Sequence, residues 1–380
     1  MKKKTKRFAP ILLICAYLVV IDIAINIVFP YPKDPRNISP SAMQHFFEYG
    51  RSIEGKLTRM TRKTNDESAP ILSTGWLDDS LNERIPKNQD SSNKPVVTVY
   101  GMSHAVLLAE DMARINNSLI IRSVGAPGAV PSWSYAAYLF EKEHHYSDVV
   151  ILGIMTRGVH LICTTSGVTN HFDSIHPYTY PRFFLSNGNL EYVLPPFISL
   201  GGYREYFYNS EKWKNYIKWL QEYDKYYDPL LFKKTILDSS SIFRMLRRAY
   251  AYSTTRKQES TVYNDIKGFD PESDEVKILR SIIVEFSQTA SRNNSLPIVY
   301  IVNNVFMGDH LFRILEPTLL SHNVLFLSTH DICPPNDPRY YDSTSHFIRS
   351  MNLELAKAMI KIIKENISLK TLKKGDQKVG

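Results

Sequence analysis

Residues 94–115, KPVVTVYGMSHAVLLAEDMARI, decide the fold of this chain. The run at 96–100 combines β-branched and aromatic side chains after a proline, a composition typical of a buried strand. Gly101 permits a tight turn, and from Ser103 onward the apolar residues recur at helical spacing. Ser103 is therefore expected where a strand ends and a helix begins, with unpaired backbone N–H groups beside its hydroxyl. This placement suits a nucleophile, and it equally suits a serine that only caps a helix.

Strands and helices alternate beyond this stretch as well. Further strands are predicted at 119–124, 148–154, 298–302 and 324–327, and helices at 132–146, 271–293, 309–320 and 345–366. Continuous apolar strands separated by helices are typical of a parallel sheet that is covered on both faces. The sequence therefore predicts an α/β fold, a three-layer parallel sheet over residues 94–366, with an inserted cap at about 160–270.

The predicted insertion is rich in aromatic residues. Residues 182–193 alternate around Asn187-Gly188, a strong hairpin signal. Helices are predicted at 212–226 and 239–252, and the first carries Tyr216, Trp219 and Tyr223 at helical spacing. Aromatic residues interleaved with Lys and Arg could contact a nucleic acid or a glycan, but helical spacing favours the core of a cap.

An apolar segment at 8–29 follows a basic start. As a helix it would rise about 33 Å, enough to cross a bilayer. Asp22 and Asn26 are costly there, and we expect them near the far interface or against a partner helix. A cleavable signal peptide is the competing interpretation, although no small-x-small cleavage site follows. We expect residues 1–30 to be a cytoplasmic start and a single transmembrane anchor, with the main domain periplasmic or extracellular.

Charge and cysteines limit the partners. The net charge of +8 is concentrated at the basic start and at a basic tail, residues 367–380, so the body is about neutral and nucleic-acid binding is disfavoured. Residues 31–93 are expected to form a stalk or linker with one helix at about 41–62. Outside the cytoplasm a disulfide is allowed, and the sequence leaves open whether Cys163 and Cys333 pair.

Three short blocks stand where strands are expected to end: GMSH at 101–104, GAPG at 125–128 and GIMTRG at 153–158. A fourth, DSTSH at 342–346, follows the loop that leaves the last predicted strand. In order and spacing the four blocks resemble the SGNH (GDSL-type) hydrolase superfamily over residues 94–154 and 271–365. The resemblance implies a flavodoxin-like sheet and esterase or O-acyltransferase chemistry that needs no cofactor.

Matched block by block, the resemblance implies that Ser103 is the nucleophile, that His346 is the general base and that Asp342 orients its ring. The backbone N–H groups of Ser103 and Gly128 would hold the oxyanion. The chemistry makes sense in itself, because serine attacks only when a base takes its proton and imidazole titrates near neutral pH. One oxyanion donor lowers the barrier by about 3 kcal/mol.

The sequence departs from the family in three ways. Gly-Asp-Ser is Gly-Met-Ser here, and the third block lacks its asparagine, for which Thr156 or Arg157 would have to substitute. DSTSH is one residue longer than Asp-x-x-His, and a spacing of four places both side chains on one face if the segment is helical. Thr156, Arg157 and His104 are the expected substrate-contacting residues, although Arg157 is equally suited to an ion pair.

The sequence thus predicts a membrane-anchored ester hydrolase or O-acyltransferase that acts outside the cytoplasm, on acyl (acetyl) groups of a surface or exported glycan or on a small ester. The alternative is a catalytically inactive envelope protein that binds glycan or scaffolds an assembly complex, and the missing asparagine favours it. His171, Asp173 and His176 have metal-like spacing, but one short loop cannot complete a zinc site, so no metal is expected.

Overall fold

The computed structural model describes residues 2–30, 41–48, 53, 56–57, 94–125, 128–170, 172, 178–233 and 235–376. The chain forms two compact units: the first is Met1–Ile71, Thr164–Thr179 and Ser199–Lys257, and the second is Leu72–Cys163, Tyr180–Ile198 and Gln258–Gly380. The insertion expected at about 160–270 is thus shared between the units. Its two long predicted helices lie in the first unit and its hairpin lies in the second.

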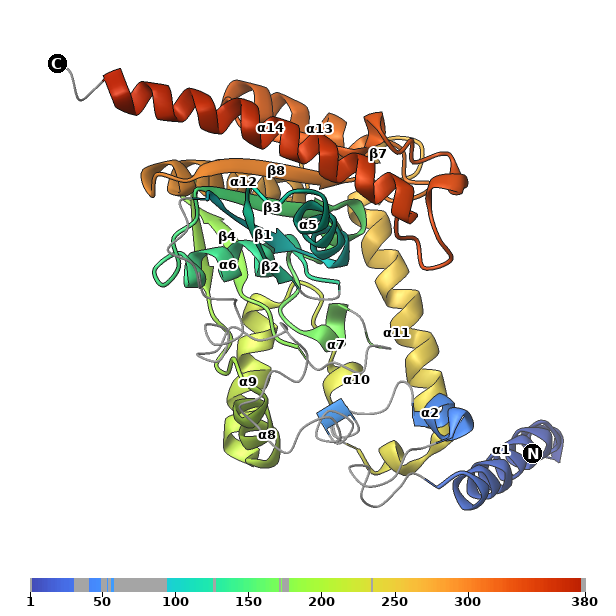
Figure 1. Cartoon of the computed structure of the whole chain (residues 1–380). Coiled ribbons are helices and arrows are strands. Elements are labelled where there is room, and N and C mark those ends of the chain that lie inside the picture. The colour runs from blue at the N-terminus through green and yellow to red at the C-terminus, as the bar shows by residue number, and fades with distance from the viewer. Residues whose placement is uncertain are drawn as a thin grey trace. The chain divides into compact units, whose positions relative to one another are not determined.

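A five-stranded parallel sheet forms the centre of the second unit, in the order β2-β1-β3-β8-β9 (Figure 1). The strands are β1 Val96–Gly101, β2 Ile120–Gly125, β3 Val149–Met155, β8 Leu296–Val302 and β9 Leu325–Ser328. β1 and β3 are buried almost throughout, as continuous apolar runs predict. The predicted α/β fold with a parallel sheet is confirmed, and the chain reverses direction across the sheet at β1 and β3, where open sheets of this kind bind ligands.

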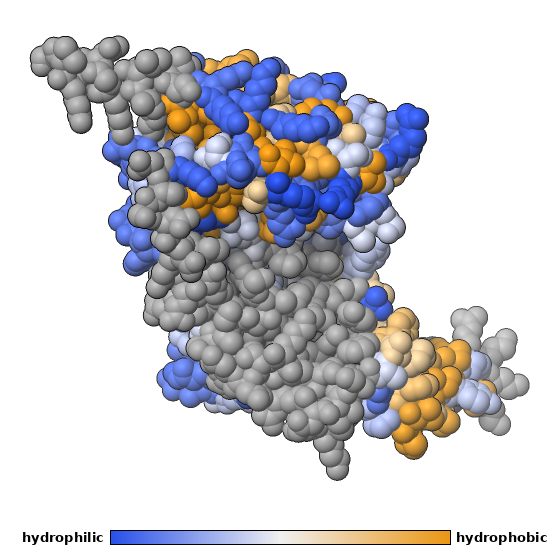
Figure 2. Space-filling view, in the orientation of Figure 1, coloured by the Kyte–Doolittle hydropathy of each residue, from blue (hydrophilic) through white to orange (hydrophobic). Residues whose placement is uncertain are grey.

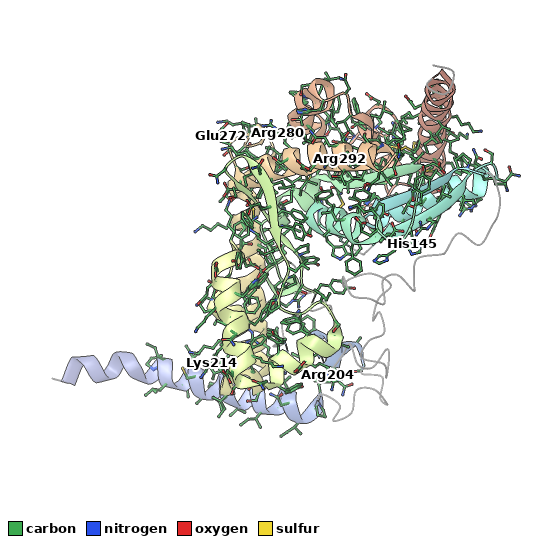
Figure 3. The ribbon with its side chains drawn as sticks, turned by 90° about the vertical axis from the view of Figure 1, so that its left-hand side faces the viewer. His145, Arg204, Lys214, Glu272, Arg280 and Arg292 are labelled. Carbon is green, nitrogen blue, oxygen red and sulfur yellow. The ribbon has the colours of Figure 1, made fainter. Side chains whose placement is uncertain are left out.

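Helices cover both faces of this sheet (Figures 1 and 3). α5 (Ser103–Ile115) packs with α14 (Arg349–Asp376) on one face, and α6 (Pro131–Glu141), α12 (Asp274–Arg292) and α13 (His310–Ser321) lie on the other. Arg280, labelled on α12 in Figure 3, donates to the carbonyl of Ile314 at 3.0 Å and so joins α12 to α13.

The predicted hairpin is present. β4 (Arg182–Ser186) and β5 (Asn189–Val193) pair antiparallel, and the turn residues Asn187 and Gly188 have φ of 50° and 82°. Two positive φ angles in succession are what a type I′ turn requires. A second short pair, β6 (Tyr263–Asn264) and β7 (Gly268–Phe269), follows α11 (Ser241–Val262).

The first unit is helical, with a core of tyrosines. Its elements include α2 (Ala42–Glu48), α7 (Gly167–Asn170), α8 (Leu200–Tyr208), α9 (Ser210–Tyr223), α10 (Pro229–Phe232) and the beginning of α11. Tyr203 of α8 and Tyr216 of α9 are fully buried, with ring centroids 6.0 Å apart. Trp219 stacks on Tyr216 and is half-buried, so the aromatic stripe of α9 faces a core as its spacing predicts.

The N-terminal helix α1 (Lys2–Val28) contains a segment, Pro10–Val28, that is long and apolar enough to cross a membrane, with a mean hydropathy of 2.7. Figure 2 shows hydrophobic side chains of α1 at the surface, and most of the large apolar residues of this segment are exposed. Asp22 and Asn26 face α11: Asp22 Oδ1 accepts from the N–H of Ile242 at 2.9 Å, and Asn26 Oδ1 accepts from the Ser241 hydroxyl at 3.2 Å. These hydrogen bonds offset the cost of two polar groups in an apolar helix.

The structure also bears on the helix predicted at about 41–62 and on whether Cys163 and Cys333 pair. The helix expected at about 41–62 begins as α2, and most of residues 49–93, including the expected linker, lie outside the described residues. Cys163 and Cys333 are both buried, and no disulfide joins them.

Gly153 of β3 allows α5 to lie close to the sheet. A Cβ at this position would lie 2.8 Å from the Cβ of Ala105 in α5. We expect Gly153→Ala to lower the free energy of unfolding by about 1–3 kcal/mol, because an overpacked interface must shift. Urea unfolding of the full chain measures this. The loss should shrink in an Ala105→Gly background, and an unchanged unfolding midpoint would contradict the packing described.

Candidate active site

Ser103 is the first residue of α5, directly after the carboxyl end of β1. Met102 adopts an extended conformation before it and is fully buried, so the position that is aspartate in Gly-Asp-Ser holds an apolar side chain in this chain. The helix makes its first backbone hydrogen bonds from Ala105 and Val106 to the Met102 carbonyl. Within the described residues, the N–H of Ser103 has no acceptor, as expected at a helix N-terminus.

The structure brings Ser103 and His346 together. Ser103 Oγ lies 2.7 Å from His346 Nε2, although the two residues are separated by 243 positions in the sequence. Both residues belong to the second unit. The distance is that of a strong hydrogen bond between a hydroxyl and an imidazole, so His346 is placed to take the Ser103 proton.

The segment that carries Asp342 and His346 is a tight turn, so the condition that it be helical is not met, and the last helix begins after the predicted residue 345. The N–H of Asp342 donates to the His346 carbonyl at 2.7 Å, and Tyr341 and Phe347 form an antiparallel bridge. Ser345 closes the turn with a φ of 65°. α14 begins only at Arg349, because the extended bridge occupies the residues that the pattern assigned to its first turn.

Within this turn Thr344 stands between Asp342 and His346. The Thr344 hydroxyl donates to Asp342 Oδ1 at 2.6 Å and lies 2.8 Å from His346 Nδ1. Since that hydroxyl uses its proton on the carboxylate, it accepts the Nδ1 proton of His346. Nε2 is then left with a lone pair directed at Ser103. The Ser103 hydroxyl, the His346 ring, the Thr344 hydroxyl and the Asp342 carboxylate thus form one chain of hydrogen bonds, in which each group donates to the next.

Asp342 is suited to remain ionised in this turn. Its carboxylate also accepts from the N–H groups of Thr344 at 2.7 Å and His346 at 3.1 Å. These bonds, and the Thr344 hydroxyl above all, lower the pKa of Asp342 below its ordinary value. In the structure, therefore, the carboxylate acts on the His346 ring through Thr344 and binds the backbone of His346 directly.

His104 packs against the His346 ring. The two imidazoles stack with centroids 4.6 Å apart, and Phe347 contacts His104 edge-on. Burial, followed by the nearby His346, lowers the pKa of His104 to about 4. His104 Nε2 lies 3.3 Å from the Ser345 carbonyl, so this neutral ring carries its proton on Nε2. His104 is thus a wall of the site rather than a second base.

The other expected residues are placed less directly. Thr156 is buried and its hydroxyl donates to the Val302 carbonyl at 3.2 Å. Arg157 has an exposed side chain, and its backbone N–H donates to Asn304 Oδ1 at 3.1 Å. Gly128 has a φ of 64° after β2, and the two residues before it lie outside the described residues. No hydrogen bond joins any of the three to Ser103 or His346 within the described part of the chain.

Sequence reasoning missed Thr344 and Asn304. The DSTSH block contains Thr344, and turn chemistry points to it. An Asp side chain commonly accepts a hydrogen bond from the backbone N–H two residues on, which is that of Thr344 here. Asn304 follows β8, the strand next to β3, and fixes the backbone of Arg157 from there. The signal for Asn304 is that β8 lies next to β3 in the sheet, and this is known only when the strand order is known.

No group of three metal-ligating side chains occurs in the part of the chain that the structure describes, and His171, Asp173 and His176 lie outside it. No protein-family model matches the chain, and no curated protein matches it in sequence.

The neutral state of His104 predicts a pH dependence of stability. Because its folded pKa of about 4 lies below the ordinary 6.5, the unfolded chain binds the proton first. The free energy of unfolding should therefore fall as pH drops from about 6.5 to about 4, by roughly 3 kcal/mol at most.

His104→Gln should flatten this fall, as measured by urea unfolding across the range. His160, whose pKa burial also lowers to about 4, is unchanged in both proteins and so serves as an internal reference. An identical slope in the variant would show that His104 does not titrate in this way.

Proposed function

We propose that the protein is a serine ester hydrolase or O-acyltransferase with Ser103 as nucleophile and His346 as general base. The observation that carries this proposal is the 2.7 Å contact between Ser103 Oγ and His346 Nε2, with the imidazole held from its other nitrogen. A serine that only capped α5 would need no imidazole at its hydroxyl. Indeed Met102, not Ser103, is the N-cap residue of α5.

The reaction follows from these contacts. His346 Nε2 takes the Ser103 proton while Oγ attacks the acyl carbonyl, and the imidazolium forms with its Nδ1 proton bonded to Thr344. The carbonyl oxygen becomes an oxyanion beside the N-terminus of α5, where the free N–H of Ser103 and the helix dipole favour negative charge. His346 then protonates the leaving alcohol, and the acyl group remains on Ser103. Water resolves the ester in a hydrolase, and a sugar hydroxyl resolves it in a transferase.

The place of action belongs to the same proposal. α1 is long and apolar enough to anchor the chain, and its basic N-terminal residues favour a cytoplasmic N-terminus, so the site would face the periplasm or the exterior. Acyl groups on a surface or exported glycan are the substrate class that the SGNH resemblance implies. This substrate assignment rests on analogy.

One observation favours a second candidate function. The Thr156 hydroxyl is engaged with the Val302 carbonyl, so it does not replace the missing asparagine as an oxyanion donor. A site with a weak oxyanion hole suits an envelope protein that binds an acylated glycan, or a partner in an assembly complex, without turning it over.

A fluorophosphonate probe separates the two functions. Ser103→Ala should abolish labelling and reduce hydrolysis of p-nitrophenyl acetate to background, because the attacking oxygen is lost. The matched control is Ser343→Ala, which removes an exposed hydroxyl from the same turn as His346. Labelling that persists in Ser103→Ala would refute the assignment, and an unlabelled wild-type protein would favour the binding function.

The Thr344 contact predicts a graded series. Thr344→Val keeps the shape and removes the oxygen between Asp342 and His346, so kcat/KM should fall about 10- to 100-fold. Thr344→Ser keeps the hydroxyl and should retain most of the activity.

The hydrogen bond at Nδ1 strengthens only as charge forms on His346, so kcat should fall with KM unchanged in Thr344→Val. A structural role alone would lower the fraction of enzyme that the fluorophosphonate labels rather than the kcat of that fraction. If valine and serine variants behave alike, Thr344 does not connect the two groups.

A further inference from the structure

A short turn before α11 exposes two large apolar side chains. It is the 3-10 turn Ile236–Ser239, in which Ile236 is 90% exposed and Leu237 is 51% exposed. Isolated apolar side chains at a surface are ordinary, but an isoleucine with almost no contacts on a defined turn contributes nothing to a core. Lys233, just before the turn, is exposed as well.

The turn is held rigidly against the start of α11. The N–H of Thr235 donates to Asp238 Oδ2 at 2.8 Å, and Arg244 Nη1 donates to the Asp238 carbonyl at 2.9 Å. Arg247 pairs with the Asp238 carboxylate. The orientation of the two apolar side chains is therefore fixed by the fold, because both ends of the turn are bonded to α11 or to each other.

The start of α11 is in turn bonded to α1. Ser241 and Ile242 contact Asn26 and Asp22, and all of these residues belong to the first unit. Asp22 lies six residues before the end of the apolar segment Pro10–Val28. At the helical rise this is about 9 Å inside that end. If α1 spans a bilayer, the start of α11 lies at the depth of the lipid interface rather than above it.

α2 also contacts the end of the N-terminal segment and the start of α11. Phe29 at the end of α1 stacks on Phe47 of α2 at 5.7 Å, and Arg244 Nε donates to the Phe47 carbonyl at 3.2 Å. α2 also exposes apolar side chains, since Met43 is 45% exposed and Phe46 is 42% exposed. Exposed apolar side chains thus come from α2 and from the turn that precedes α11, and both α2 and the start of α11 contact the end of the N-terminal apolar segment.

We infer that the turn Ile236–Ser239, with the exposed face of α2, inserts into the interfacial region of the lipid bilayer that α1 crosses. The occupant is lipid because the start of α11, which holds the turn, is hydrogen-bonded to the apolar segment of α1, and apolar side chains beside a lysine are typical of such insertion. The inference rests on the anchoring part of the proposed function and is independent of catalysis.

The test uses the full chain with Cys15→Ala, reconstituted in phosphatidylcholine vesicles, with an environment-sensitive fluorophore on Ile236→Cys. The remaining cysteines are buried. Ile266→Cys is the matched control, an isoleucine that is 88% exposed in the turn between β6 and β7 of the other unit. We expect lipids with a nitroxide near the headgroup to quench the label at position 236 about five-fold more than the control.

Equal quenching at both positions would overturn the inference. Shielding of the 236 label that depends on protein concentration but not on nitroxide lipid would overturn it too, in favour of a second copy as occupant. Chains that do not float with the vesicles would refute the anchor and the inference together. Fluorophosphonate labelling of the same samples reports on Ser103 separately, so a failure of the enzymatic proposal is distinguishable from any of these results.

Discussion

The hydrogen bond between Ser103 and His346 depends on a long return of the chain across the sheet. β1 and β9 are separated by β3 and β8, which is about 14 Å at the usual strand spacing. Two hydrogen bonds hold the loop after β9 along this path: the N–H of Phe306 donates to the Pro335 carbonyl at 2.8 Å, and the Tyr341 hydroxyl donates to the Asn303 carbonyl at 3.0 Å. Phe306 and Asn303 both follow β8, so the loop crosses the carboxyl ends of the strands before it reaches Ser103. Without this crossing the two groups would lie three strands apart.

The position of Ser103 itself depends on how closely α5 approaches the strands. Gly101 of β1 and Gly153 of β3 leave room for Ala105, whose Cβ would lie within 2.8 Å of a Cβ added at either glycine. α14 packs against α5, and it begins three residues after His346. The helix that begins at Ser103 and the helix that follows His346 are therefore packed together, and a shift of either would change the distance between the Ser103 hydroxyl and the His346 ring.

The sequence predicted the features that a single strand, helix or turn determines. The strands of the sheet, the hairpin at Asn187-Gly188 and the position of Ser103 between a strand and a helix follow from periodicity and turn chemistry. His346 was singled out only by the resemblance to a known family. The turn around Thr344 did not follow, because a spacing of four residues fits a helix as well as a tight turn and only the Tyr341–Phe347 bridge decides between them. The pairing of Asp22 and Asn26 with α11 joins segments more than 200 residues apart, and no local pattern encodes it.

The neutral state of His104 explains how a second imidazole can lie against His346 without opposing a positive charge on it. In the proposed reaction His346 would carry a positive charge, and a charged ring stacked at 4.6 Å would oppose that charge directly. Burial removes the difficulty, because it lowers the pKa of His104 to about 4 and keeps this ring neutral in the pH range where His346 would work as a base. The positive charge formed on His346 is then balanced from the opposite side, through Thr344, by the ionised Asp342. Burial, followed by the nearby His346, thus distinguishes two adjacent histidines: His104 stays neutral, and His346 is the ring that would move the proton in the proposed reaction.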